Sequence, residues 1–262
     1  SIVKSVPELA SGHGRSLDKF EAMVPGSMAG AECLDDLEFL ATDPGYLETV
    51  NRTYTAKSYG DYLRTFTEFQ CKTLQYALIN QSFAMRAQAV GATKTVTIDV
   101  DSTSNRQYGK KMEGVEKNYK FIECLDTLKA FDEYGFPYWH DVRPGATNTC
   151  VGAAEVISSI FLRLPTDGVY KGVKRFVRGD SGYCNVDVFN ACRLANAEFV
   201  THMRENMFEP RLHTITKWFA QNPNDPDRIR SHDGRECEFG ETYYFPEKGL
   251  ETLRIVCLRA EK

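Results

Sequence analysis

The stretch KTVTIDVDST, from Lys94 to Thr103, decides the fold predicted for this chain of 262 residues. Three β-branched apolar residues alternate with polar ones, which is typical of a strand with one buried face. Asp99 and Asp101 are expected on the opposite face of that strand, and two hydroxyl side chains follow them. The pattern indicates chemistry carried by an aspartate, but it is shared by at least two unrelated classes of enzyme.

Downstream of this stretch, the signals follow the order β-β-β-α-β-α-β. Strands are expected over residues 94–100, 118–128, 136–142, 173–180 and 198–204, and helices over 151–164 and 186–197. Short turns separate the first three strands, which predicts an antiparallel meander. A meander followed by alternating helices and strands is the order of the ribonuclease-H-like fold, an α/β fold with a mixed sheet.

The segments on either side differ from this core, and the chain is expected to divide into residues 1–92, 93–204 and 205–262. The first part is expected to be helical, with one helix ending at Pro44-Gly45 and one or two amphipathic helices over 58–88. In the last part, a short helix over 214–221 precedes two strand-like runs. We interpret this part as a β-rich insertion that the end of the chain interrupts.

Composition excludes several classes of protein. Lys and Arg number 32 against 36 Asp and Glu, a net charge of −4, which argues against a domain that wraps DNA but not against local basic surfaces. The eight cysteines form no CxxC pair, which favours free thiols in a reducing cytoplasm over zinc sites or a disulfide scaffold. No apolar run reaches membrane-spanning length and the first residues show no signal-peptide pattern, so no membrane partner is expected. No small-molecule cofactor is expected either.

One interpretation of the two aspartates is a haloacid-dehalogenase-like phosphatase. In that family the first aspartate of a D-x-D-x-T motif, here Asp99, is the nucleophile and the second, here Asp101, is the acid/base. That fold is a parallel sheet and needs a helix between successive parallel strands. Two strand-like segments follow the motif instead, which counts against this hypothesis.

The second interpretation starts from the predicted sheet. In the ribonuclease-H-like order the first strand lies between the second and the fourth, so Asp101 and Asp180 would meet at neighbouring strand tips. Two such carboxylates can bind a pair of Mg²⁺ or Mn²⁺ ions about 3.5–4 Å apart. Gly179 and Gly182 flank Asp180, where they would relieve the backbone at the turn and allow close approach of metal or DNA.

Three blocks of sequence resemble the catalytic core of bacterial insertion-sequence transposases of the DDE type. They are TIDVDST (97–103), VRPG (142–145) and RFVRGDSGY (175–183), in the same order as in that family. The likeness spans roughly residues 94–204 and is closest to the group with a β-rich insertion before the final Glu. It implies metal-dependent DNA cleavage and strand transfer by two-metal phosphoryl transfer.

The resemblance also implies roles for particular residues. Asp101 is the first catalytic acid and Asp180 the second, both as metal ligands, with Asp99 as a supporting or alternative ligand. The family's third acid, a Glu on a helix after the insertion, is expected beyond Lys262, so this polypeptide is expected to be inactive or weak alone. The Asn that normally follows the R-P-G step is displaced here to Asn148.

The expected partners are the DNA of the transposon ends and of the target, together with a second subunit in an active complex. The protein is expected in the cytoplasm, in association with the nucleoid. The alternative within the same family is a non-catalytic fragment that binds DNA or another subunit. The basic residues expected near the DNA are Arg106, Lys110, Lys111, Lys117, Lys120, Arg143, Arg163, Lys171, Lys174, Arg175 and Arg178, and a solvated face of mixed charge is the alternative for any one of them.

Overall fold

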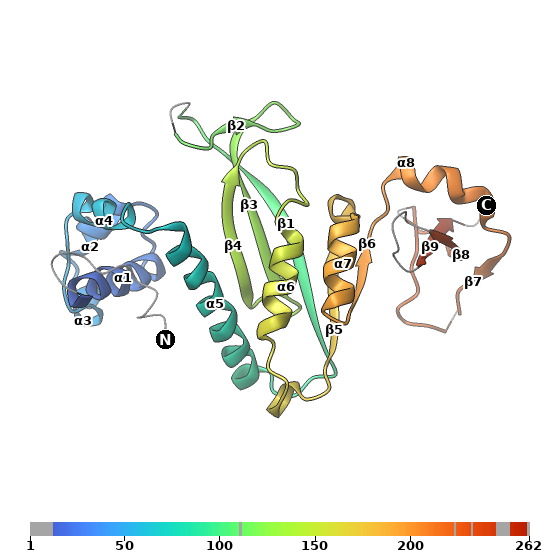
Figure 1. Ribbon diagram of the computed structural model, residues 1–262, viewed down its shortest axis with the longest axis horizontal. Helices are drawn as coiled ribbons and strands as arrows, with labels where there is room; N and C mark the ends of the chain where they lie inside the picture. Colours follow the sequence, from blue (N-terminus) through green and yellow to red (C-terminus); the bar gives the residue numbers. More distant parts are fainter. Residues whose placement is uncertain (1–12, 110–111, 223, 232, 245–251, 261–262) are drawn as a thin grey trace. The chain divides into compact units, whose positions relative to one another are not determined.

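The computed structural model describes residues 13–109, 112–222, 224–231, 233–244 and 252–260. The chain divides into two compact units (Figure 1). The first unit comprises Ser1–Gly91 with Pro137–Trp139, and the second comprises Ala92–Phe136 with His140–Lys262.

Helices make up most of the first unit. They are α1 (His13–Met28), α2 (Leu34–Leu40), α3 (Pro44–Thr49), α4 (Ala56–Leu63) and α5 (Glu68–Ala89). The expectation of two helices over 58–88 is confirmed, but Pro44 begins a helix rather than ending one. The reason is local: the Asp43 side chain accepts the Tyr46 N–H, and a proline at the first helical position loses no hydrogen bond.

The second unit contains the main sheet, shown in green to orange in Figure 1. Its strands are β1 (Thr95–Arg106), β2 (Glu116–Lys117), β3 (Glu123–Asp132), β4 (Pro137–Pro144), β5 (Lys174–Gly179) and β6 (Ala197–Thr201). The order is β2-β3-β1-β5-β6, with β4 paired to β3. Strand β1 is antiparallel to β3 and parallel to β5, while β5 is parallel to β6. The predicted mixed, ribonuclease-H-like sheet is therefore confirmed.

The alternation in the opening stretch has the predicted consequence. Val96, Ile98 and Val100 are buried on one face of β1, while Asp99 and Asp101 lie on the other. Helices α6 (Ala153–Arg163) and α7 (Val186–Leu194) pack against each other and lie in front of the sheet in Figure 1.

The strand predicted over 118–128 begins later than expected and runs on to Asp132, because residues 118–122 form a tight turn before β3 begins. The stretch NYKFI is rich in residues that favour strands. The Asn118 side chain overrides that preference, since its Oδ1 accepts the backbone N–H groups of Lys120 and Ile122.

The C-terminal part of the second unit carries a separate three-stranded sheet in the order β7-β8-β9. Its elements are α8 (Glu205–Phe208), the 3₁₀ turn η4 (Glu209–Thr214), β7 (Trp218–Ala220), β8 (Cys237–Tyr244) and β9 (Leu253–Ala260). The helix expected over 214–221 was wrong. Trp218 pairs with Gly240, whose missing side chain leaves room for Ile215 and the Trp218 ring.

No helix in the described part of the chain combines the length and apolar character that a bilayer crossing requires.

Candidate active site

The two predicted acids follow the last paired residues of β1 and β5. The parallel register runs from Thr95 opposite Lys174 to Val100 opposite Gly179. Asp101 and Asp180 are the next residues, so both lie at the same end of the β1–β5 pair; Asp101 still pairs with Lys129 on β3, whereas Asp180 follows the end of β5. Strand β1 does not end at Asp101 as expected; it continues to Arg106 because β3 still pairs with it.

Both carboxylates are exposed and have only local hydrogen bonds. Oδ1 of Asp101 accepts the N–H of Ser102 at 2.8 Å, and Oδ1 of Asp180 accepts the N–H of Gly182 at 2.8 Å. Neither forms an ion pair within the described residues. A carboxylate has about four acceptor positions, so most of their capacity remains open to an external partner.

A buried tyrosine, Tyr183, follows Asp180 in the chain and lies beside Ser102, the neighbour of Asp101. The Tyr183 side chain is 1% exposed, and its hydroxyl lies beside Ser102 without reaching normal hydrogen-bond geometry. Burial raises the pKa of Tyr183 far above its usual value, and the negative charges of Asp101 and Asp180 both add to this rise.

Glycine packing makes room for this tyrosine. A Cβ at Gly179 would lie 2.9 Å from Tyr183 Cδ2, and one at Gly182 would lie 2.8 Å from Thr149 Cγ2. Neither glycine has a positive φ, so close packing rather than backbone freedom accounts for them. Thr149 belongs to the loop between β4 and α6, and this contact places that loop against the Asp180 turn.

Asp99 is held by an arginine. Its Oδ1 lies 2.6 Å from Arg178 Nε and its Oδ2 lies 2.7 Å from Arg178 Nη2, a two-pronged contact across the β1–β5 pair. The expected role of Asp99 as a ligand would require this pair to break. Arg178, expected near DNA, has its guanidinium directed at Asp99, although the side chain is 62% exposed.

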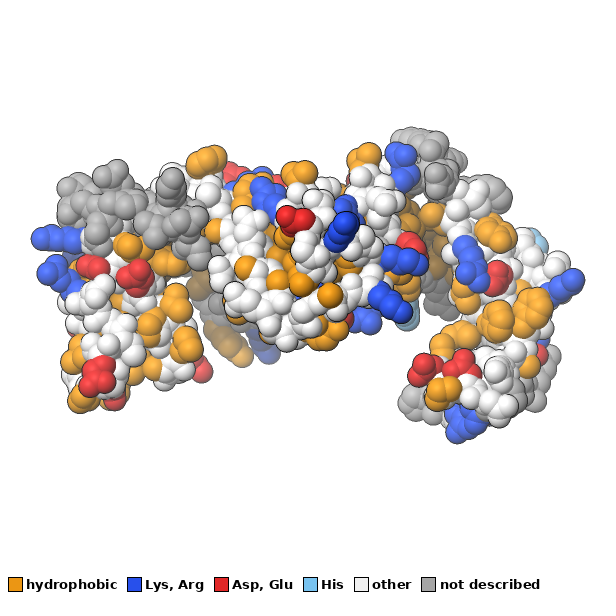
Figure 2. Space-filling model, turned by 90° about the horizontal axis from the view of Figure 1, so that it is seen from below, with side chains coloured by type: hydrophobic (Ala, Val, Ile, Leu, Met, Phe, Trp, Pro, Cys, Tyr) orange, Lys and Arg blue, Asp and Glu red, His pale blue; other side chains and the backbone are white. Residues whose placement is uncertain are grey.

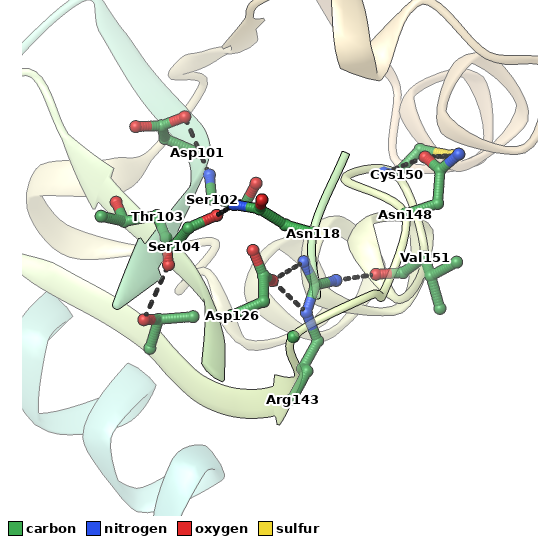
Figure 3. A network of polar contacts seen from close by, with 12 residues as sticks. Asp101, Ser102, Thr103, Ser104, Asn118, Asp126, Arg143, Asn148, Cys150 and Val151 are labelled. Atoms are coloured by element: carbon green, nitrogen blue, oxygen red, sulfur yellow. Dashed lines mark hydrogen bonds and ion pairs between the residues drawn. The ribbon is translucent and has the colours of Figure 1, made fainter. Parts of the chain in front are cut away.

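The VRPG block has a structural explanation (Figure 3). Arg143 is buried, and its Nε and Nη2 both donate to Oδ2 of Asp126 on β3, with the Nε contact at 2.8 Å. Its Nη1 donates to the carbonyl of Val151, in the turn just before α6. Arg143 was expected near DNA, but internal acceptors take up its guanidinium because Asp126 is itself buried.

The glycine of the same block lies against the backbone of β3. A Cβ at Gly145 would lie 1.9 Å from the Cys124 carbonyl oxygen and 2.6 Å from that of Glu116. The Gly145 N–H donates to the Gly114 carbonyl at 3.0 Å. Arg143 and Gly145 thus fix the path of the chain from β4 into the loop that touches the Asp180 turn.

Asn148, which is displaced from its place in the family pattern, forms hydrogen bonds within the β4–α6 loop. Its Oδ1 accepts the Cys150 N–H at 3.3 Å, and Asn185 Nδ2 lies 3.6 Å from Cys150 Sγ. Asn185 caps the start of α7. Asn148 therefore shapes the β4–α6 loop beside α7, and the structure gives it no contact with either acid.

The other basic residues are distributed along the sheet. Lys174 begins β5, about 16 Å along the strand from its opposite end, where Asp180 follows. Arg106 ends β1 and stacks over Tyr108, while Lys110 and Lys111 lie outside the described residues. The face of the molecule seen in Figure 2 carries Lys and Arg side chains together with Asp and Glu side chains.

Sequence reasoning missed the partners of several of these residues. Asp126 carried a signal, because it alternates with Cys124 and Leu128 on the buried face of β3 and a buried acid requires a cation. Lys129, which pairs opposite Asp101 across β1 and β3, carried no comparable signal.

The two acids fit a hard divalent cation. They are exposed, charged oxygen donors, and no side-chain cation of the described chain pairs with them. No set of three or more His, Cys, Asp or Glu side chains among the described residues could hold a metal ion.

Comparison with protein families identifies the chain. Residues 15–262 match the model of the family described as Transposase DDE domain group 1. The chain belongs to this transposase family. No curated protein matches the sequence. The resemblance to DDE-type transposases is therefore confirmed at the level of the family.

Solved structures give weaker likenesses. The chain is 13% identical to a Mos1 transposase in a paired-end complex with the left transposon end, covering 70% of this chain and 58% of that one, with a TM-score of 0.27. It is 11% identical to the catalytic domain of Mos1 mariner transposase, covering 57% and 72%, with a TM-score of 0.29. The fold assignment rests on strand order, because likeness this low adds nothing to it.

The phosphatase hypothesis does not survive. Its parallel sheet conflicts with the antiparallel pairing of β1 and β3, and its nucleophile, Asp99, is held by Arg178. Membership in the DDE transposase family points the same way.

Proposed function

We propose that this member of the DDE transposase family is part of the catalytic core of a bacterial insertion-sequence transposase that cuts and joins DNA. Asp101 and Asp180 would be its first two catalytic acids. The observation that carries the proposal is the β1–β5 register, which brings two exposed carboxylates off neighbouring parallel strands in a chain of this family.

Asp101 and Asp180 would hold Mg²⁺ or Mn²⁺. When bound, such ions lower the pKa of a coordinated water and stabilise charge on the leaving oxygen of a phosphodiester. Other residues of the chain would hold these two acids in position. The Asp180 turn is supported by the packing of Tyr183 on Gly179, and the β4–α6 loop is fixed by Arg143 and Gly145. Transposon-end and target DNA would be the substrates, and a second subunit would complete the active complex.

Asp99 would act indirectly. Its pair with Arg178 joins β1 to β5 two residues before the acids, so it would hold the two strand ends in register. We propose it as a positioning residue rather than a ligand in the resting chain.

Metal binding tests this proposal without requiring turnover. Calorimetry with Mn²⁺ should show binding to the wild-type chain, and Asp101→Asn and Asp180→Asn should each weaken the affinity at least about 10-fold, since each removes one charged ligand. Asp187→Asn is the matched control, because Asp187 lies in the first turn of α7 and should leave binding unchanged.

DNA binding that is unaffected by either substitution, together with no measurable Mn²⁺ binding, would instead favour the non-catalytic alternative.

Asp99→Asn tests whether Asp99 is a positioning residue or a metal ligand: a positioning role predicts a smaller loss of Mn²⁺ affinity than either acid shows. If the protein acts on chromosomal DNA, its place is with the nucleoid.

A further inference from the structure

A tight turn at residues 118–122 displays two aromatic rings to solvent. Asn118 organises it: Oδ1 accepts the N–H of Lys120 at 2.9 Å and of Ile122 at 3.1 Å, and the Asn118 carbonyl accepts the N–H of Phe121 at 2.9 Å. Asn118 is buried, and its Nδ2 donates to Ser104 Oγ on β1 at 3.1 Å. The turn is therefore fixed to the strand that carries Asp101.

The rings on this turn are unusually open. Tyr119 and Phe121 are each 83% exposed, and Tyr108 at the end of β1 is 86% exposed. Phe121 has a φ of 57°, a conformation that bulky residues rarely adopt. Binding sites often contain strained backbone and apolar side chains exposed to water, and this turn has both.

Cations accompany the rings. Lys120 Nζ lies 5.3 Å from the centre of the Tyr119 ring, and the Arg106 guanidinium lies 5.2 Å from that of Tyr108. Residues 104–123 contain five Lys or Arg against three Glu, in a chain whose net charge is −4. One of those acids, Glu116, accepts the Ala146 N–H and so belongs to the fold.

The position of the turn relates it to the acids. Ser104 lies three residues beyond Asp101 on β1, about 10 Å along the strand. That distance equals about three base steps of a nucleic acid strand. Figure 3 shows the bond between Asn118 and Ser104, on the strand that also carries Asp101, and Figure 1 shows β2 and its neighbouring loops extending beyond the other strands of the sheet.

We propose that this surface, formed by Arg106, Tyr108, Lys117, Tyr119, Lys120 and Phe121, stacks unpaired bases of the DNA strand that approaches the acids. The inference rests on the proposed function and names the form of DNA recognised. Exposed rings interleaved with cations suit single strands, whose bases offer free faces and whose phosphates need positive charge. A duplex offers those faces only at its ends. The core of a protein interface would instead be depleted of charge.

The test compares two DNA molecules that differ only in an unpaired end. One is a blunt duplex and the other the same duplex with a four-nucleotide 3′ overhang containing 2-aminopurine, whose fluorescence falls on stacking. The wild-type chain should bind the overhang DNA more tightly and quench its fluorescence. Tyr119→Ala/Phe121→Ala should remove the quenching and weaken overhang binding about 10-fold or more, with less than a 2-fold change for the blunt duplex.

Phe69→Ala is the matched control, because Phe69 is an exposed ring on α5 and should leave both affinities unchanged. Circular dichroism should confirm that the double variant folds, as expected for side chains with so little burial. Asn118→Ala provides a second variant, which should lose the quenching while keeping both rings.

Three results would overturn the inference: an unchanged quench in the double variant, an equal loss for the two DNA molecules, or a loss of self-association with DNA binding intact. The last would assign the rings to a second copy of the chain. Failure of the proposed function is measured separately, as absence of Mn²⁺ binding that depends on Asp101 and Asp180. A wild-type chain that binds neither DNA would contradict both proposals.

Discussion

Asp126 and Asp101 lie on neighbouring strands of one sheet, yet they differ in burial and in hydrogen bonding. Asp126 on β3 is buried and accepts two N–H groups from Arg143, whereas Asp101 on β1 is exposed and accepts one local N–H group. A buried charge needs its partner within the fold, while an exposed carboxylate can remain available to an external cation. The difference separates an acid held within the fold from an acid that is open to an external partner.

The largest effect should come from breaking the buried pair. Arg143→Ala leaves the Asp126 carboxylate buried without a cation and removes the hydrogen bond to the Val151 carbonyl. The free energy of unfolding should fall by about 3–5 kcal/mol. Chemical denaturation measures the loss.

The double variant Asp126→Leu/Arg143→Met removes both charges and should recover most of that stability, because apolar replacements of a buried pair are often neutral. If Arg143→Ala changes stability by less than about 1 kcal/mol, the pair is not an internal structural element.

A second structural element can be broken without touching a charge. Gly145→Ala would place Cβ 1.9 Å from the Cys124 carbonyl oxygen, a backbone atom in β3 that cannot rotate away. Stability should fall by about 1–3 kcal/mol, as for other overpacked positions. Gly109→Ala is the control, since no atom lies within 4 Å of its added Cβ. Equal thermal shifts for the two variants would contradict the packing argument.

Breaking the pair between Asp99 and Arg178 should destabilise the fold less than either of these changes. The Arg178 side chain is 62% exposed, so Asp99→Asn should cost about 0–1 kcal/mol in unfolding free energy. The cost should shrink as NaCl rises from 50 mM to 1 M, because salt screens exposed charges. A loss comparable to that of Arg143→Ala would show that this pair is as structural as the buried one.

Sequence predicted the sheet because its signals are local. The alternation of Val96, Ile98 and Val100 identifies β1, and the acid that follows Gly179 could be placed beside Asp101 once the strand order was assumed. The partner of Asp99 depends on register, since Arg178 is 79 residues away. No local pattern specifies which side chain will lie opposite across a sheet.

Two errors have different physical origins. Residues 118–122 contain side chains that favour a strand, but one of them, Asn118, makes the local hydrogen bonds of a turn. Residues 214–221 were expected to be helical although Thr, Ile, Trp and Phe favour strands. There Trp218 finds a strand partner in Gly240, 22 residues later, so local preference and tertiary pairing agree on a strand.

The smallest effect should come from the open acids, and this sharpens the contrast with Asp126. In the absence of divalent metal, Asp101→Asn and Asp180→Asn should change the free energy of unfolding by no more than about 0.5 kcal/mol, because each carboxylate is exposed and keeps only a local contact. Denaturation in EDTA measures this change, and stabilisation by Mn²⁺ should appear in the wild-type chain and be lost in the variants. A large loss of stability in EDTA would show that these acids hold the fold together, as Asp126 does.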